Sequence, residues 1–237
     1  MMKQNGFLET GDGHALYWRL SGAADGVPVI LLHGGPGCSM DAYLADYFDL
    51  SKTRFLQFDQ RGCGRSSPPG SLHNNTTAHL VSDIEALRHY HGFENPILCG
   101  GSWGSTLAIE YAKAYPEHVS KLLLNSVFLG RDADEDWFLN GVRALRPDAW
   151  NQLTDGFSEA EKANIGMALY TRAFSEDEDR VRDVVARFSN YMGTLLKLDP
   201  DLASPVQAEQ VTAAPIPAIR IFLPYSSNPS FLSPDQG

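Results

Sequence analysis

The chain has 237 residues, of which 43% are hydrophobic and 20% are charged, and its formal net charge at pH 7 is −10. This composition suits a packed globular protein and excludes disorder or a collagen-like repeat as the main organisation. The acidic balance argues against nucleic acid and anionic membranes as partners, because both favour basic faces, and no apolar run is long enough to span a bilayer.

The first part of the chain alternates short apolar runs with helical patterns. Strands are expected at residues 27–32, 55–58, 97–99 and 122–129, and helices at residues 77–91 and 106–115. Thr77 is a suitable N-cap for the first of these helices. Such alternation predicts a parallel sheet wrapped by helices, with ligands bound at the carboxyl ends of the strands.

After residue 130 the strand signal disappears. Helices are expected at residues 137–144, 160–173 and 177–198, whereas residues 204–237 are rich in Pro and Ser and show no clear helix or strand. We therefore divide the chain into an α/β core at residues 1–130 and a helical part at residues 131–237.

The sequence Gly-Gly-Ser-Trp-Gly at residues 100–104 fits the pattern G-x-S-x-G, with an apolar strand before it and a helix after it. Glycines at these positions let a strand turn sharply into a helix and project the serine hydroxyl from the bend. This context favours Ser102 as a nucleophile. The alternative is a Gly-rich turn whose serine only caps the helix.

Two further loops follow predicted strands. His33-Gly34-Gly35-Pro36-Gly37 is the kind of loop that donates a backbone N–H to an oxyanion, and the N–H of Trp103 is the expected second donor. In this loop His33 is expected to fix the backbone rather than act as a base.

The loop Asp59-Gln60-Arg61-Gly62-Cys63-Gly64-Arg65-Ser66 is expected to support the site through hydrogen bonds, chiefly from Asp59 and Arg61. Substrate binding by Arg61 or Arg65 is the lesser alternative.

These three motifs, in this order, resemble those of the proline iminopeptidases of the α/β-hydrolase superfamily. The stretches at residues 75–88 and 147–150 are similar as well, and the helices that follow resemble the cap subdomain of that family. The resemblance implies Ser102 as nucleophile and the amides of Gly35 and Trp103 as the oxyanion hole. It also implies release of an N-terminal residue, typically proline, from small peptides without a metal or other cofactor.

The sequence departs from the family pattern in its catalytic base. In α/β-hydrolases the triad order is Ser, then Asp or Glu, then His, but none of the seven histidines lies beyond His118. The helix after Ser102 carries His118 on the order of 20 Å from the hydroxyl. We therefore expect the triad Asp and His to be absent, the last strands of the sheet to be missing, both parts to be incomplete, and this chain to be inactive alone.

The second departure concerns specificity. By resemblance, the family binds the free amine of its substrate with two carboxylates, and Met192 and Phe222 stand at those positions here. Apolar side chains there would remove the charge pairing for an ammonium group. Two alternatives therefore stay open: an esterase-like α/β-hydrolase with an apolar pocket, or a non-catalytic fragment or pseudoenzyme.

Other expectations concern partners and location. The polar first residues lack the apolar stretch of a signal peptide, and three sparse cysteines are expected to stay reduced, which predicts a cytoplasmic protein. A small peptide or ester is the expected substrate. An incomplete sheet would expose a strand edge at residues 122–129 and favour self-association.

Overall fold

The structure is a computed structural model that describes residues 2–40, 47–196, 207–211 and 215–227. Within these residues the chain forms two compact units, one reaching Gly130 and the other spanning Arg131–Ser227. The first unit contains a β-sheet with helices, and the described elements of the second are all helical.

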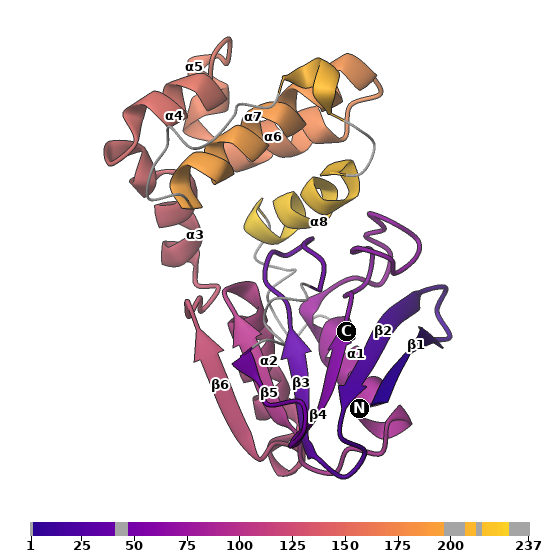
Figure 1. Cartoon of the computed structure of the whole chain (residues 1–237). Helices are drawn as coiled ribbons and strands as arrows, with labels where there is room; N and C mark the ends of the chain where they lie inside the picture. Colours follow the sequence, from indigo (N-terminus) through magenta and orange to yellow (C-terminus); the bar gives the residue numbers. More distant parts are fainter. Residues whose placement is uncertain (1, 41–46, 197–206, 212–214, 228–237) are drawn as a thin grey trace. The chain divides into compact units, whose positions relative to one another are not determined.

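One mixed sheet organises the first unit, with its six described strands in the order β1-β2-β4-β3-β5-β6 (Figure 1). β1 and β2 pair antiparallel, β2 pairs antiparallel with β4, and β4, β3, β5 and β6 run parallel to one another. The strands are β1 Met2–Glu9, β2 Ala15–Gly22, β3 Val27–Leu32, β4 Thr53–Phe58, β5 Ile97–Gly101 and β6 Lys121–Asn125. The expected α/β fold class is thereby confirmed, with an antiparallel pair of strands added at one edge.

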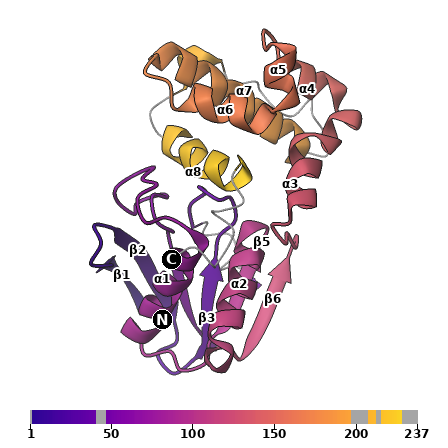
Figure 2. The ribbon, with the colours of Figure 1, turned by 180° about the vertical axis from the view of Figure 1, so that it is seen from behind.

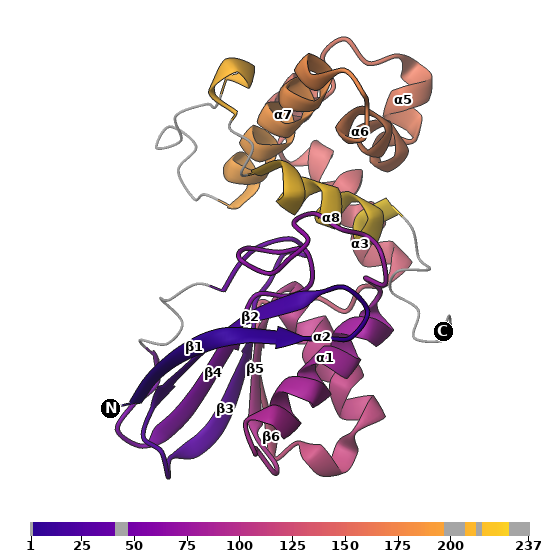
Figure 3. The same ribbon diagram turned by 90° about the vertical axis from the view of Figure 1, so that its right-hand side faces the viewer.

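Helices α1 (Thr77–Tyr90) and α2 (Trp103–Ala114) lie on one face of this sheet (Figures 2 and 3). The apolar positions Leu80, Ile84 and Leu87 of α1 are buried, as helical spacing predicts. The N-cap of α1 is Thr76 rather than the expected Thr77, whose side chain is buried. A short 3₁₀ helix, Pro116–His118, follows α2.

The second unit is built from helices around an apolar cluster. Its elements are α3 Asp132–Leu139, η3 Gly141–Ala144, α4 Pro147–Leu153, α5 Glu159–Ala163, α6 Ile165–Ala173, α7 Glu178–Leu196, η5 Ala208–Gln210 and α8 Pro215–Ser227. The side chains of Leu153, Leu169, Val184 and Leu223 are buried in the cluster, so that α4, α6, α7 and α8 share one core. Of the helices in the described part of the chain, none combines the length and apolar character that a bilayer crossing requires.

Two further local expectations were wrong, and one strand was not predicted. β6 ends at Asn125 instead of residue 129, because the chain turns at Ser126 with a φ of 46°. The polar start of the chain forms β1. Its pairing with β2 determines this strand more than its own composition does. The Pro-rich stretch contains α8, whose first proline lies at the helix start, where proline is tolerated, while Ile219 and Leu223 anchor the helix in the core.

Candidate active site

Ser102 lies at the sharp bend between β5 and α2, and its side chain is exposed. Its backbone has φ 53° and ψ −122°, a conformation that costs a non-glycine residue about 1 to 3 kcal/mol. Two hydrogen bonds hold the bend: the Ser102 N–H donates to the Asn125 carbonyl (3.1 Å), and the Ser105 N–H donates to the Ser102 carbonyl (2.8 Å). The fold therefore keeps a strained serine projecting from a rigid turn.

Two glycines of the motif are required by close packing around this bend. A Cβ atom on Gly100 would lie 2.1 Å from the Gly104 carbonyl oxygen, and one on Gly104 would lie 2.1 Å from the Leu32 carbonyl oxygen. Any larger residue would separate α2 from β3 and β5. The spacing of the motif thus follows from the approach of helix and strand beneath the serine.

The loop after β3 lies beside Ser102. A Cβ atom on Gly34 would be 3.4 Å from the Ser102 Cβ, and Gly35 and Gly37 have positive φ angles of 119° and 95°. The ring of His33 holds this loop, because its Nδ1 lies 2.8 Å from the Gly34 carbonyl oxygen. The loop expected to carry one oxyanion donor and the predicted nucleophile are therefore neighbours.

The loop after β4 is fastened to the ends of the glycine-rich loop. A carboxylate oxygen of Asp59 accepts from the Met40 N–H (2.6 Å), and the other accepts from the Arg65 N–H (3.0 Å). The Gln60 N–H donates to His33 Nε2 (3.0 Å), while the Gln60 side-chain amide donates to the His33 carbonyl (2.9 Å). His33 thus has a partner at each ring nitrogen.

The same Gln60 side chain reaches the nucleophile turn. Its Oε1 accepts a hydrogen bond from Trp103 Nε1 (3.1 Å), and both side chains are buried. Sequence reasoning overlooked Gln60, because its partners lie far along the chain. The only available signal was a polar residue directly after a buried strand, next to Asp59 and Arg61.

Arg61 anchors this loop to α1 and to the β1–β2 turn. Its guanidinium makes two hydrogen bonds to the Asp83 carboxylate (2.6 and 2.7 Å) and also bonds Asp12 (2.5 Å) and the Asn74 carbonyl (2.8 Å). The Arg61 side chain is only 4% exposed, so these contacts leave little of it for a substrate. Arg65, in contrast, is exposed and stacks over the Tyr17 ring.

The charges of this cluster shift one another. Burial raises the pKa of the Asp83 carboxyl to about 6, although the Arg61 guanidinium opposes the shift. Burial also tends to raise the pKa of Asp12, but hydrogen bonds from Thr10 and Arg61 hold it well below its usual range.

Two hydroxyls of α2 attach the segment after β6 to the same turn. The Ser105 Oγ accepts from the Phe128 N–H (3.0 Å), and the Thr106 Oγ1 donates to the Phe128 carbonyl (2.6 Å). Neither residue was singled out in the sequence. Both contacts join residues more than 20 positions apart, so no local pattern signals them.

Within the described residues no side chain hydrogen-bonds the Ser102 hydroxyl. His118 contacts Glu85 on α1 (3.3 Å) and follows the C-terminal end of α2, whereas Ser102 precedes its N-terminal end. The helix between them is roughly 18 Å long at 1.5 Å per residue. Nor do three His, Cys, Asp or Glu side chains of the described ranges gather in a way that could hold a metal ion.

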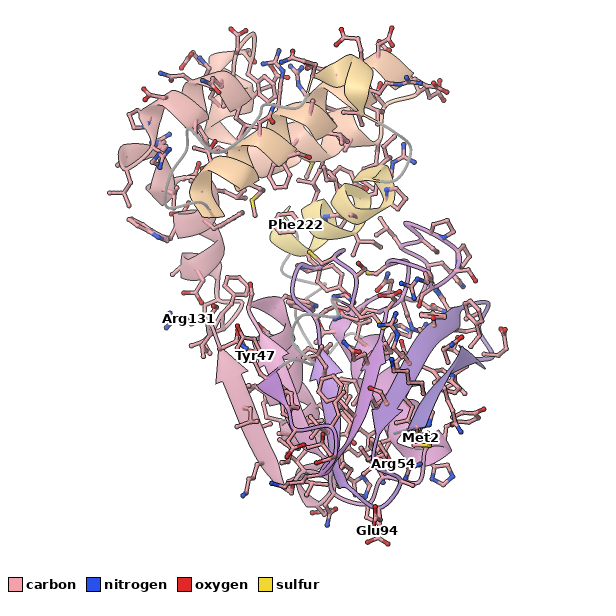
Figure 4. The ribbon with its side chains drawn as sticks, viewed as in Figure 1. Met2, Tyr47, Arg54, Glu94, Arg131 and Phe222 are labelled. Atoms are coloured by element: carbon pink, nitrogen blue, oxygen red, sulfur yellow. The ribbon has the colours of Figure 1, made fainter. Side chains whose placement is uncertain are left out.

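The two residues expected to line a substrate pocket lie in the second unit. Met192 on α7 and Phe222 on α8 are both partly buried and pack against the apolar cluster. Phe222 is labelled in Figure 4. The Phe222 ring centroid is 5.9 Å from that of Phe138 and 5.2 Å from that of Phe188. Phe222 therefore contributes to the core of this unit, and its role toward a substrate stays a prediction.

Comparison with known proteins places this arrangement in a family. The sequence profile of the alpha/beta hydrolase fold family matches residues 27–210. The chain belongs to the alpha/beta hydrolase fold family. This alpha/beta hydrolase is 38% identical over 207 residues to a proline iminopeptidase of Arabidopsis thaliana, covering 86% of the chain and 54% of the relative. It is 35% identical over 199 residues to the proline iminopeptidase of Neisseria gonorrhoeae, covering 83% and 64%.

A solved structure agrees with this similarity. The proline iminopeptidase-related protein of Thermus thermophilus is 29% identical and superposes with a TM-score of 0.52 over 73% of this chain and 61% of that protein. The chain spans 54% to 64% of the length of the two curated relatives. The expected resemblance to proline iminopeptidases is thus confirmed.

Proposed function

We propose that this chain carries the nucleophile and oxyanion part of a serine hydrolase of proline iminopeptidase type. In this reaction the Ser102 oxygen attacks the carbonyl carbon of the N-terminal residue, typically proline. The peptide C–N bond breaks, and a base transfers the Ser102 proton to the departing amine. Water then hydrolyses the acyl-serine ester and frees the N-terminal residue. The amides of Gly35 and Trp103 would stabilise the negative charge on the carbonyl oxygen. The observation that carries the proposal is the strained, exposed Ser102 with the glycine-rich loop beside it.

We also propose that Ser102 in this chain reacts slowly when no base is added. A serine hydroxyl needs a general base, and the described residues offer none to Ser102. Positioned bases contribute about 10²- to 10⁴-fold to such reactions. An added small base should therefore accelerate acylation of Ser102 if the rest of the site is in place.

Covalent labelling tests Ser102 directly. The chain is incubated with a fluorophosphonate probe, with and without imidazole, and the modified peptide is identified by mass spectrometry. The Ser102 oxygen bonds to phosphorus, fluoride leaves, and imidazole accepts the proton. We expect modification at Ser102 that imidazole accelerates at least about tenfold.

The control for this experiment is Ser102→Ala, which should abolish the modified peptide. Ser82→Ala, which removes an exposed hydroxyl on α1, should label like the wild type. Modification of a different serine, or none at Ser102 with imidazole present, would contradict the proposal.

Substrate preference separates the two hydrolase candidates. The esterase-like alternative is favoured by the apolar Met192 and Phe222, which both pack against the apolar cluster. Turnover of proline 4-nitroanilide is compared with that of N-acetylproline 4-nitroanilide and 4-nitrophenyl acetate, with the Ser102→Ala chain as blank. A preference for the free amine supports the iminopeptidase, whereas equal or better turnover of the acetylated or ester substrate supports the esterase.

A cytoplasmic location is part of the proposal. It is supported by the sparse cysteines of the chain, of which Cys63 and Cys99 are buried and form no disulfide, as expected in a reducing compartment. Small peptides or esters, rather than nucleic acids or membranes, are the proposed partners, in keeping with the net charge of −10.

A further inference from the structure

One buried side chain, that of Gln60, links the three loops that carry the sequence motifs. We propose that Gln60 is a positioning residue that holds the two amide donors of the oxyanion site at a fixed separation. The inference rests on the proposed function, because it assigns a role only if Gly35 and Trp103 act as donors. Gln60 itself is 2% exposed and follows β4.

Gln60 first holds His33, the residue at which the glycine-rich loop begins. Its side-chain Nε2 donates to the carbonyl of His33, and its backbone N–H donates to His33 Nε2. The His33 ring in turn contacts the Gly34 carbonyl. The Gly34 carbonyl belongs to the same peptide group as the Gly35 N–H. The His33 ring that Gln60 holds therefore contacts this peptide group directly.

Gln60 also fixes the residue that follows the nucleophile. Its Oε1 accepts from the indole N–H of Trp103, whose side chain is 1% exposed at the first position of α2. Rotation of this first turn would move the Trp103 backbone N–H, the second proposed donor. The indole contact thus sets the orientation of that donor relative to the loop at residues 33–37.

Only a group with both a donor and an acceptor can make these two contacts at once. The amide of Gln60 donates to a carbonyl and accepts from an indole, whereas an ionised carboxylate only accepts and a leucine does neither. A protonated carboxylic acid has both functions. A glutamate at residue 60 should therefore make both contacts only when it is protonated, so the effect of Gln60→Glu should depend on pH.

The residues on either side of Gln60 are each held in place by contacts of their own. Asp59 holds the Met40 amide beyond the far end of the glycine-rich loop, and Arg61 is ion-paired with the buried Asp83. Both neighbours are held by contacts that do not involve Gln60. A change at residue 60 should therefore displace the glycine-rich loop and the turn at Ser102, and leave the chain after β4 in place.

The experiment measures fluorophosphonate labelling of Ser102, with imidazole present, in Gln60→Leu, Gln60→Glu and the matched control Gln57→Leu. Gln57 is equally buried (2%) but lies within β4 rather than in the loop after it, so Gln57→Leu removes a buried amide from the sheet instead of from the loop. We expect Gln60→Leu to label about 10- to 100-fold more slowly than the wild type, as expected for a misplaced oxyanion donor, and Gln57→Leu to stay within about threefold.

The glutamate variant distinguishes positioning from a general packing effect. Gln60→Glu should be slow at about pH 8, where the carboxylate faces the His33 carbonyl, and should approach the wild-type rate at about pH 5, where the acid can donate. The ratio of Gln60→Leu to wild type should not change with pH. A pH-independent ratio for Gln60→Glu would overturn the proposal.

An NMR measurement tests the same contact without any labelling reaction, so a slow labelling rate does not prevent the test. In ¹⁵N-labelled chain at one fixed pH, the Trp103 indole N–H resonance should shift and exchange faster in Gln60→Leu, which offers no acceptor, than in the wild type, whereas Gln60→Glu should keep it protected because its carboxylate still accepts from the indole. An indole N–H whose resonance and exchange rate are unchanged in Gln60→Leu would overturn the link between Gln60 and Trp103.

The remaining outcomes separate the two proposals. If Ser102 labels in the wild type but Gln60→Leu labels at the same rate, the role of Gln60 is wrong and the proposed function stands. If Ser102 never labels in the wild type, the proposed function fails and the role of Gln60 fails with it.

Discussion

The two units of this chain are stabilised by different kinds of contact. The motif loops of the sheet unit are held by buried polar and charged side chains, with Asp59, Gln60 and Arg61 each bonding a different segment. The helical unit is closed by an apolar cluster to which α4, α6, α7 and α8 contribute. Polar contacts are directional and leave costly unpaired groups when one partner is lost, whereas apolar packing tolerates adjustment. Single substitutions should therefore cost more in the loops than in the helices.

The largest effect is expected at the buried ion pair. Arg61→Met leaves the Asp83 carboxylate buried without its bidentate partner and should lower the free energy of unfolding by about 3 to 5 kcal/mol. Chemical denaturation combined with hydrogen exchange of α1 peptides measures the loss. The double variant Arg61→Met/Asp83→Leu should recover part of it, since no carboxylate then remains unpaired. A loss below about 1 kcal/mol in the single variant would remove the contrast between the units.

A smaller loss is expected in the helical unit. Leu169 on α6 is fully buried, and Leu169→Ala should cost about 3 kcal/mol through lost burial and a cavity. Hydrogen exchange should accelerate in peptides of α6 and α7 and stay unchanged in those of β3 and β5. Leu145→Ala, at a side chain 68% exposed, serves as the control and should change little. Faster exchange in the sheet peptides would show that the two units unfold together.

The next effect depends on pH and comes from a histidine in the sheet unit. His91 is buried against Trp18, with ring centroids 4.5 Å apart, and burial lowers its pKa to about 4. Below its unfolded pKa of about 6.5 the unfolded chain binds the proton more readily, so stability falls as the pH drops from about 6.5 to about 4. His91→Phe should remove about 2 kcal/mol of this loss.

Urea denaturation at about pH 7 and about pH 5 measures the effect of His91→Phe. At the higher pH the variant should match the wild type, because the His91 Nε2 has no hydrogen-bond partner to lose. An equal drop in stability between the two pH values in both chains would rule out His91 as the source.

The motif loops were predictable because their signals are local. Glycine spacing around Ser102 reports the close approach of β5 and α2, and the strand before each loop is a short apolar run. Gln60 was not predictable in this way. Its contact with Trp103 joins residues 43 positions apart and depends on the sheet bringing β3, β4 and β5 together.

The helical unit was less predictable for the opposite reason. Four of its helices, α3, α4, α5 and α6, have nine residues or fewer, which leaves little length for a helical pattern to show. α8 was missed because Pro215, Pro217 and Pro224 suggest an irregular segment, although Leu223 is fully buried in the core. Met192 and Phe222 were identified only by resemblance, and the packing of Phe222 between two other phenylalanines is a tertiary feature that no sequence motif indicates.

The smallest effect on stability is expected at the edge of the sheet. β6 is the last strand in the described order, and Leu122 and Leu123 on it are 37% and 45% exposed. An exposed strand edge with apolar side chains offers hydrogen bonds and surface to a second copy of the chain. We therefore expect concentration-dependent self-association of the wild-type chain in sedimentation velocity experiments. Leu123→Lys should weaken this association, because charged side chains protect strand edges. It should change the unfolding free energy by less than about 0.5 kcal/mol, because exposed positions contribute little to stability. Lys121→Arg, on the same strand with its charge retained, should associate like the wild type. A wild-type chain that stays monomeric at every concentration tested would show that this edge is not adhesive, and the two units would then differ only in how their interiors are held.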